Sequence, residues 1–202
     1  MLDRLVVGTA NWGRDYNGHC VDEKEQNLIM EYMKEVGIEW LDVAEAYGTL
    51  DIGKDFKRVV KTGQCNRDIV LQETDIKICH RGKWFNKDSE FYEGVSVDKV
   101  TEIGLTSRLP LWIEFPYSIL NRNEGCIMMS VASKLIARSI FCKGKALKYF
   151  SPRECIDFVL MNPRIDKVIL GVDSVDQLVS NVEHLVRMER FEHNEEIDTR
   201  KF

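Results

Sequence analysis

The stretch GIEWLDVAEAYG, from Gly37 to Gly48, joins a buried strand to polar side chains at its exit. Its apolar run is typical of a strand covered on both faces, as in a parallel sheet. Asp42 ends that run and Tyr47 follows five residues later, with small residues between and after them. Functional groups collect at the carboxyl ends of strands in parallel α/β folds. Asp42 and Tyr47 are therefore candidate functional residues, although a local pairing of Asp42 and simple packing of the Tyr47 ring would also fit this strand alone.

Short apolar runs alternate with helix-like segments along the rest of the chain. Strands are expected at 4–10, 38–44, 68–78, 102–106, 111–115, 136–141 and 166–172. Helices are expected at 23–36 after an Asp22 cap, at 53–63, at 125–135, from 152 after Ser151, and from 175 after Ser174. This alternation predicts right-handed βαβ units around a parallel sheet.

Two parallel folds accommodate about seven strands in 202 residues. One is an α/β barrel of the TIM (β/α)8 type, which usually takes ~250 residues and at least ~200. The other is an open doubly wound sheet, but the first loop, GTANWG, lacks the Gly-x-Gly-x-x-Gly pattern of its dinucleotide-binding members. We expect a single domain over residues 1–202, with a charged tail at 189–202 that frays.

The composition argues against several classes of partner and site. The net charge is −5 with no dense basic block, so neither a nucleic acid nor a membrane surface is an expected partner. No apolar run reaches membrane-spanning length, and the N-terminal run is too short for a signal peptide. The six cysteines form no Cys-x-x-Cys pair, so we expect buried thiols, no metal site and a cytoplasmic protein.

Six segments, taken in order, resemble motifs of the aldo-keto reductase family. They are LVVGTANWGRDYN for the first strand and loop, GIEWLDVAEAYG for GINxxDTAxxYG, EIGLTS for xIGxSN, IEFPYSILNR for xQxPYNxLxR, IARSIFCKGKAL for RSxFxxGxL, and VILGVDSVDQLVSNVEHL for xIxGxxSxEQLxxN. Each match is weak alone, and their common order covers most of the chain. The resemblance implies a (β/α)8 barrel that reduces a small aldehyde or ketone substrate with NADPH.

The resemblance also implies that an aspartate, a tyrosine, a lysine and a histidine carry the chemistry. Tyr47 would donate a proton to the carbonyl oxygen, an ammonium beside it would lower its pKa from about 10, and Asp42 would hold that ammonium. The segment LQETDIKI offers two alignments for the lysine, one at Lys77 and one that puts Asp75 in its place. We favour Lys77. The histidine has no match, because His80 comes too early in the chain.

The cofactor site implied by the resemblance has two ends. The nicotinamide end matches Thr106, Ser107 and Glu114, with Tyr117 able to stack on the ring. The family has Gln where this chain has Glu114, so a hydrogen-bond donor is lost and a negative charge is added. The phosphates and adenosine are expected at Arg138, Ser139, Gly171, Val172, Ser174, Gln177 and Asn181.

The polar segment from 79 to 98 has no clear strand and is short for a helix, a strand and a second helix. We therefore predict a shortened barrel that is incomplete or distorted, because a lost βα unit exposes strand edges. Either Glu90–Val97 supplies an improvised strand or a partner covers the gap, for example in a homodimer. Three hypotheses follow: a shortened reductase, a catalytically inactive binding or structural protein derived from one, and an unrelated α/β binding domain.

Overall fold

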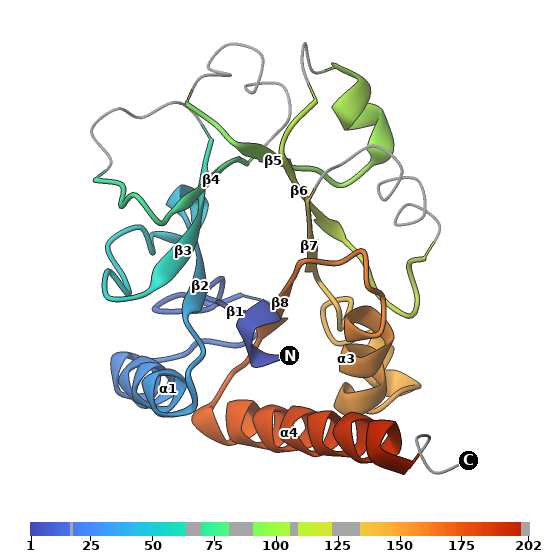
Figure 1. Ribbon diagram of the computed structural model, residues 1–202. Helices are drawn as coiled ribbons and strands as arrows, with labels where there is room; N and C mark the ends of the chain where they lie inside the picture. Colours follow the sequence, from blue (N-terminus) through green and yellow to red (C-terminus); the bar gives the residue numbers. More distant parts are fainter. Residues whose placement is uncertain (17, 64–69, 81–90, 106–108, 123–133, 199–202) are drawn as a thin grey trace.

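Eight parallel strands close into a barrel in chain order (Figure 1). The computed structural model describes residues 1–16, 18–63, 70–80, 91–105, 109–122 and 134–198. The strands are Leu5–Gly8 (β1), Trp40–Ala44 (β2), Lys57–Thr62 (β3), Ile76–Cys79 (β4), Gly94–Ser96 (β5), Trp112–Pro116 (β6), Lys134–Arg138 (β7) and Lys167–Gly171 (β8). The predicted TIM-type α/β barrel is therefore confirmed.

The barrel is closed, so it is not incomplete as one form of the prediction had it; the alternative, that Glu90–Val97 supplies a strand, is confirmed. β5 lies within the segment Glu90–Val97 and pairs on one side with β4, through Ile78 and Gly94, and on the other with β6, through Gly94 and Trp112. The sequence pattern does not predict this strand clearly, because the strand is only three residues long and begins with glycine. Since each described strand has a neighbour on both sides, the described barrel lacks the exposed edge on which the homodimer was predicted.

Two further elements differ from the sequence predictions. The segment 53–63, expected as a helix, contains β3, which pairs with β2 over five residues. The segment 102–106, expected as a strand, lies largely in the 3-10 helix η4, Val100–Leu105. Short runs of this kind carry too few apolar residues for periodicity to separate helix from strand, and pairing with a neighbour decides. Most of the helix expected at 125–135 lies outside the described residues, and its last two positions begin β7.

Three α-helices match the predicted caps. Helix α1, Glu23–Val36, starts where the Asp22 side chain accepts a hydrogen bond from the Glu25 N–H, and it ends at Gly37 with φ of 78°. Helix α3, Pro152–Leu160, follows a capping box at Ser151, and α4 spans Val175–Asp198. The expected fraying of the tail from 189 stays a prediction. Among the described residues, no helix is both long and apolar enough to cross a membrane.

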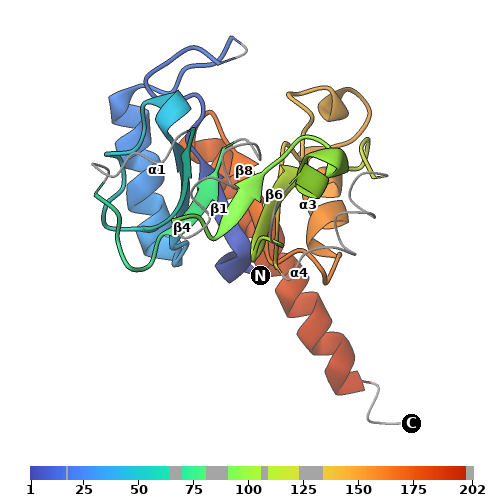
Figure 2. The ribbon, with the colours of Figure 1, turned by 90° about the horizontal axis from the view of Figure 1, so that it is seen from above.

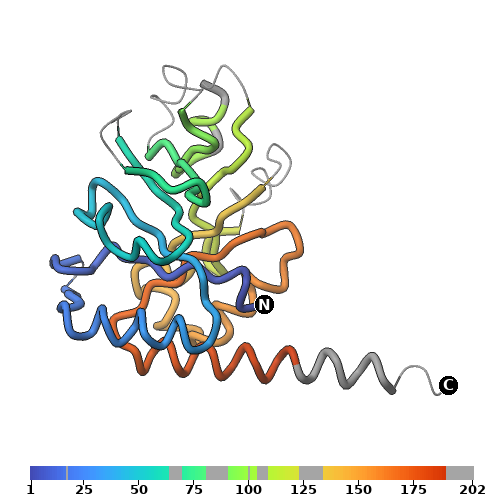
Figure 3. The backbone as a smooth tube through the Cα atoms, turned by 60° about the vertical axis from the view of Figure 1, so that its left-hand side comes forward, coloured from blue at the N-terminus to red at the C-terminus, as the bar shows by residue number. Residues whose placement is uncertain are grey.

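The described α-helices lie on one side of the barrel. In Figure 1, α1, α3 and α4 gather beside β1, β2, β7 and β8. Figures 2 and 3 show the first part of α4 lying beside the barrel. The connection from β2 to β3, residues 45–56, contains only the 3-10 helix η2, Glu45–Tyr47, where a TIM barrel usually has an α-helix. The remaining 3-10 helices described are η1, Leu2–Arg4, and η5, Ala146–Lys148.

A buried ion pair lies on the side of the barrel that this short connection leaves thinly covered. Arg58 of β3 makes two hydrogen bonds to Asp75, Nε to Oδ1 at 3.1 Å and Nη2 to Oδ2 at 2.6 Å. Arg58 Nη1 also donates to the Leu50 carbonyl at 2.8 Å. Both charged side chains are at most 1% exposed. Through the bonds of Arg58 to Leu50 and to Asp75, the pair connects the β2–β3 connection to the chain before β4.

Alternation along the strands places charged residues in one layer of the barrel interior. The inner apolar cluster consists of Val6, Val59, Ile76, Ile78, Trp112, Ile136 and Ile169, with Trp40 packed against it. Side chains two positions apart share a face of a strand. Each of four of these apolar residues is followed two positions later by a charged residue: Trp40 by Asp42, Val59 by Lys61, Trp112 by Glu114 and Ile136 by Arg138. Four strands therefore deliver a charged side chain to the carboxyl end of the barrel.

Candidate active site at the barrel mouth

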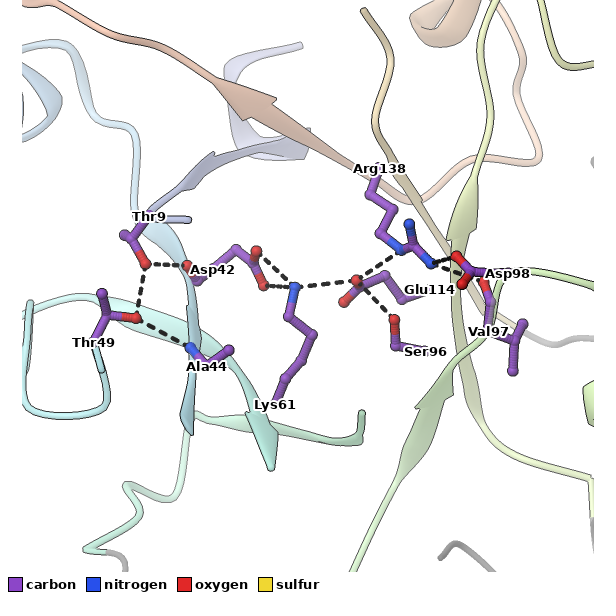
Figure 4. Close-up of polar contacts among 10 residues, drawn as sticks. All are labelled: Thr9, Asp42, Ala44, Thr49, Lys61, Ser96, Val97, Asp98, Glu114 and Arg138. Carbon is purple, nitrogen blue, oxygen red and sulfur yellow. Dashed lines mark hydrogen bonds and ion pairs between the residues drawn. The ribbon is translucent and has the colours of Figure 1, made fainter. Parts of the chain in front are cut away.

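A chain of ion pairs crosses the carboxyl end of the barrel (Figure 4). The Lys61 ammonium lies 2.7 Å from each oxygen of the Asp42 carboxylate and 3.1 Å from Glu114 Oε1. Glu114 Oε1 is also 3.3 Å from Arg138 Nε, and Arg138 Nη2 is 2.6 Å from Asp98 Oδ1. We call these five residues the mouth network. Lys61 and Glu114 are at most 1% exposed, and a charged side chain can stay buried to this extent only if it is paired with opposite charges.

Tyr47 lies against this network. It is the last residue of η2, and Gly48 follows with φ of 75°, which turns the chain back toward the barrel. The Lys61 ammonium and the Arg14 guanidinium each lie 5.2 Å from the centroid of the Tyr47 ring. The ring of His80, the residue after β4, meets the Tyr47 ring edge to face at a centroid distance of 6.0 Å. An aspartate, a lysine, a tyrosine and a histidine thus share the mouth.

Two threonines hold the turn that carries Asp42 and Tyr47. Thr9, after β1, donates from its hydroxyl to the Asp42 carbonyl at 2.7 Å, and that hydroxyl lies 2.9 Å from the hydroxyl of Thr49. The Ala44 N–H donates to Thr49 Oγ1 at 3.1 Å. Both threonines are at most 1% exposed, so the bonds are shielded from water. The strand end and the following turn are therefore fixed relative to β1.

Burial and mutual interaction shift the proton affinities at the mouth. Burial raises the pKa of Asp42 to about 7 against the lowering effect of Lys61, and the Glu114 carboxylate adds to the rise. Burial alone would lower the pKa of Lys61, but Asp42 and Glu114 raise it above its ordinary value. Burial also raises the pKa of Tyr47; Lys61 opposes that rise, while the two carboxylates reinforce it. The ammonium thus serves two carboxylates as well as the phenol.

Solved structures with this architecture are found, although no protein-family model and no curated protein matches the sequence. A candidate aldo-keto reductase from Pseudomonas aeruginosa matches with a TM-score of 0.64 and 17% identity, over 90% of this chain and 88% of that one. The chain has the aldo-keto reductase fold. An aldo-keto reductase from Bacillus halodurans, in its holo form, matches with a TM-score of 0.57 and 15% identity, over 90% and 86% of the two chains. An aldo-keto reductase enzyme from a Medee basin deep-sea metagenome library gives a TM-score of 0.58 and 15% identity, over 88% and 82%.

Within the aldo-keto reductase fold, Lys61 rather than Lys77 stands beside Asp42. Lys77 lies between the inward-facing Ile76 and Ile78 of β4, so its side chain leaves the opposite face of the strand. The alternative position, Asp75, is occupied by the pairing with Arg58 described above. This placement corrects the prediction of Lys77. Lys61 was missed because the segment 53–63 was interpreted as a helix; the alternation Lys57, Val59, Lys61 was the signal available.

The conclusion that no histidine follows the fourth strand was also wrong. It rested on a strand that ran over 68–78 and was counted third, whereas β4 covers only Ile76–Cys79 and is the fourth. His80 therefore occupies the residue directly after the fourth strand, and its N–H donates to the Thr62 carbonyl of β3 at 2.9 Å. Its place beside Tyr47 follows from the pairing of β3 with β4.

Only part of the expected nicotinamide end is found at the mouth. Thr106 and Ser107 lie outside the described residues. Glu114 belongs to the mouth network. Tyr117 is a correction: its ring packs in the outer core, 5.3 Å from the ring of Phe158 in α3, and it is only 6% exposed. A ligand in the mouth could not stack on it.

Ser96, at the end of β5, takes the place that was expected of Thr106. Its hydroxyl donates to Glu114 Oε1 at 3.1 Å. The strand beside Glu114 is therefore Gly94–Ser96, and the motif xIGxSN, if read there, has Val97 in place of asparagine. The Val97 carbonyl accepts a hydrogen bond from Arg138 Nη2 at 3.0 Å. Position 97 therefore lacks the amide side chain of the motif, and it contacts the mouth network through its backbone carbonyl.

The residues expected at the phosphate end come from the ends of β7 and β8 and from α4. Arg138 ends β7 and points to Glu114, and Ser139 follows with φ of 55°. Gly171 ends β8 with open space around it, and Ser174 Oγ accepts a hydrogen bond from the Gln177 N–H at 3.3 Å. The other two residues expected at this end, Val172 and Asn181, are buried. Whether this group binds an anion stays a prediction.

Proposed function

We propose that this chain is an NADPH-dependent reductase of aldehydes or ketones in which Tyr47 donates the proton. The observation that carries the proposal is the convergence of Asp42, Lys61, Tyr47 and His80 at the carboxyl ends of β2, β3 and β4. These are the four residue types that the family resemblance requires, and they meet at the end of the barrel where function collects. A cytoplasmic location stays a prediction from the sequence, whereas closure of the barrel leaves the predicted homodimer without the strand edge on which it rested.

Each side chain has a role that its contacts support. When the Tyr47 hydroxyl gives its proton to a carbonyl oxygen, the phenolate that remains is stabilised by the nearby Lys61 ammonium. Asp42 holds that ammonium in place at 2.7 Å. The His80 ring beside Tyr47 can orient the carbonyl oxygen toward the phenol. Burial of Asp42, Lys61 and Glu114 keeps water from competing for these contacts.

Two features of the mouth support binding of a dinucleotide. NADPH would supply the hydride that reaches the carbonyl carbon. Gly171 leaves open space at the end of β8, and the start of α4 after Ser174 would favour a phosphate. Glu114 Oε2 is buried without a hydrogen-bond partner among the described residues, so it can accept a bond from the N–H group of a carboxamide.

Cofactor binding and turnover can be separated in one experiment. Quenching of tryptophan fluorescence by NADPH, measured at low salt, reports binding; loss of NADPH absorbance with a panel of aldehydes and ketones reports reduction. Tyr47→Phe should keep the binding and lose about 10²–10⁴-fold in rate, because the proton donor is removed. Tyr32→Phe, on α1, is the matched control and should retain both. Reduction by Tyr47→Phe at the wild-type rate would refute the proposed role.

A catalytically inactive binding protein is the second candidate, and a specific observation favours it. Glu114 stands where the family motif has Gln, and it shares the Lys61 ammonium that would otherwise serve Tyr47. Saturable NADPH binding without reduction of any carbonyl in the panel would support this candidate. A flat titration with NADPH would leave only the fold in common with the reductases.

A further inference from the structure

The buried Glu114 has no role in the proton transfer proposed above, yet it contacts the lysine on which that transfer depends. Its Oε1 lies 3.1 Å from the Lys61 ammonium and accepts a bond of 3.1 Å from Ser96. Arg138 Nε lies 3.3 Å from the same oxygen. This carboxylate oxygen therefore accepts two hydrogen bonds, from Lys61 of β3 and Ser96 of β5, and also forms an ion pair with Arg138 of β7. A side chain this buried and this well contacted has a defined position relative to Lys61.

The Lys61 ammonium has only three N–H donors to distribute. Asp42 takes one at 2.7 Å and Glu114 takes a second at 3.1 Å, which leaves one for Tyr47. A second buried carboxylate also cancels part of the positive charge that the phenolate would need. We propose that Glu114 is a positioning residue, which divides the Lys61 ammonium between two carboxylates and so sets how readily Tyr47 gives up its proton.

The groups that face Tyr47 come from six parts of the barrel. They are Arg14 after β1, Asp42 of β2, Lys61 of β3, His80 after β4, Glu114 of β6 and Arg138 of β7. Among these, Glu114 and Asp42 are the carboxylates, and Asp42 is required to hold Lys61. Glu114 is thus the carboxylate whose charge can be removed while the Asp42–Lys61 pair remains. Consistent with this, burial raises the pKa of Tyr47, and Glu114 adds to the rise.

This inference rests on the proposed function, because the acidity of Tyr47 matters to a reaction only if Tyr47 donates a proton. Its test does not need the reaction. The ionisation of Tyr47 is followed by the ultraviolet absorbance of tyrosinate, as the difference between each protein and its Tyr47→Phe counterpart across a pH titration. This difference isolates one phenol among the six tyrosines of the chain.

Glu114→Gln keeps the shape of the side chain and removes its charge. It should lower the midpoint of Tyr47 ionisation by about one pH unit, because a nearby like charge is gone. Arg138→Gln removes the cation that offsets Glu114, so it should move the midpoint the other way. Ser96→Ala loosens Glu114 but keeps its charge, and it should not lower the midpoint. Circular dichroism confirms that each variant is folded at the pH values used.

The outcomes distinguish an effect of the Glu114 charge from an effect of packing. They also distinguish failure of this inference from failure of the proposed function. An unchanged or raised midpoint in Glu114→Gln overturns the inference, as does an equal lowering in Ser96→Ala. If the wild type reduces carbonyls, the falling limb of its rate against pH should shift down with the midpoint in Glu114→Gln. If the midpoint shifts and no variant reduces any carbonyl, Glu114 still positions Lys61 and the proposed function alone has failed.

Discussion

At the scale of single residues, the mouth network makes Asp42 and Lys61 depend on each other. Lys61 is 1% exposed and Asp42 is 4% exposed, and their pairing brings a full charge of each sign into the interior. Such pairs are weak evidence for net stability, but removing one partner leaves the other charge buried without a counter-charge. The same two residues therefore serve the proposed chemistry and respond strongly to substitution.

Lys61→Met should lower the free energy of unfolding by about 3–5 kcal/mol, because it leaves two buried carboxylates without their cation. Lys77→Met, a matched lysine on the outer face of the neighbouring strand, should cost less than about 1 kcal/mol. Urea denaturation of both variants measures the difference. Equal losses would contradict the assignment of Lys61 to the mouth.

Asp42 makes the stability depend on pH with a defined sign. Its pKa is raised to about 7 in the folded state, above an unfolded value of ~3.9. The folded state therefore binds this proton more tightly, and the stability that this group contributes is lost as the pH rises through about 4 to 7. Asn at position 42 does not titrate, so Asp42→Asn should gain stability relative to the wild type across that window.

The comparison is made by urea denaturation at several pH values, with Asp55→Asn as the control for loss of an exposed carboxylate paired with Lys34. Only the trend of the difference between variant and wild type with pH is tested, since loss of the pairing with Lys61 also shifts its absolute value. If the difference in free energy of unfolding stays constant, or if the variant loses stability relative to the wild type as the pH rises, Asp42 is not the group responsible.

At the scale of elements, close backbone approach makes β5 depend on Gly94. A Cβ at Gly94 would lie 2.5 Å from the Trp112 carbonyl oxygen and 2.6 Å from the Trp112 Cβ, while one at Gly171 would meet open space. Gly94→Ala should therefore cost at least about 2 kcal/mol and Gly171→Ala less than about 1 kcal/mol. Thermal unfolding of the two variants decides. Equal stability would mean that β5 and β6 do not pair as described.

The Arg58–Asp75 pair belongs to the same scale, because it ties two connections together where the β2–β3 connection has no α-helix. Arg58→Met should cost about 3–5 kcal/mol, since it leaves Asp75 buried and unpaired. The double variant Arg58→Met, Asp75→Leu should recover most of that loss, because a well-packed apolar pair can replace a buried ion pair. Urea denaturation of the single and double variants gives both values. No recovery in the double variant would show that the hydrogen bonds to the loops, such as that to Leu50, dominate.

At the scale of the whole molecule, closure of the barrel removes the reason for predicting a homodimer through a strand edge. We expect the chain of 23.4 kDa to elute as a monomer in size-exclusion chromatography with light scattering. Twice that mass would point to a different contact surface, because the described strands already have both neighbours. A dimer that persisted in Gly94→Ala would exclude β5 as that surface.

Much of the outer frame could be read from local patterns. The caps at Asp22, Ser151 and Ser174 predicted the starts of three helices, and apolar runs predicted β1, β2, β6 and β8. These signals are local, since a cap or an apolar run contains its own evidence. The placement of Asp42 and Tyr47 at a strand exit belongs to the same class.

The sequence by itself therefore determined the starts of three helices, four of the strands, the barrel class and two of the four residues proposed to act. Only the tertiary structure decided that 57–62 and 94–96 are strands, because pairing with neighbours overrides weak local preference. That pairing in turn turned Lys61 inward and Lys77 outward, and it brought His80 to Tyr47. Closure of the ring is a property of all eight strands together, so no single stretch of sequence could have shown it.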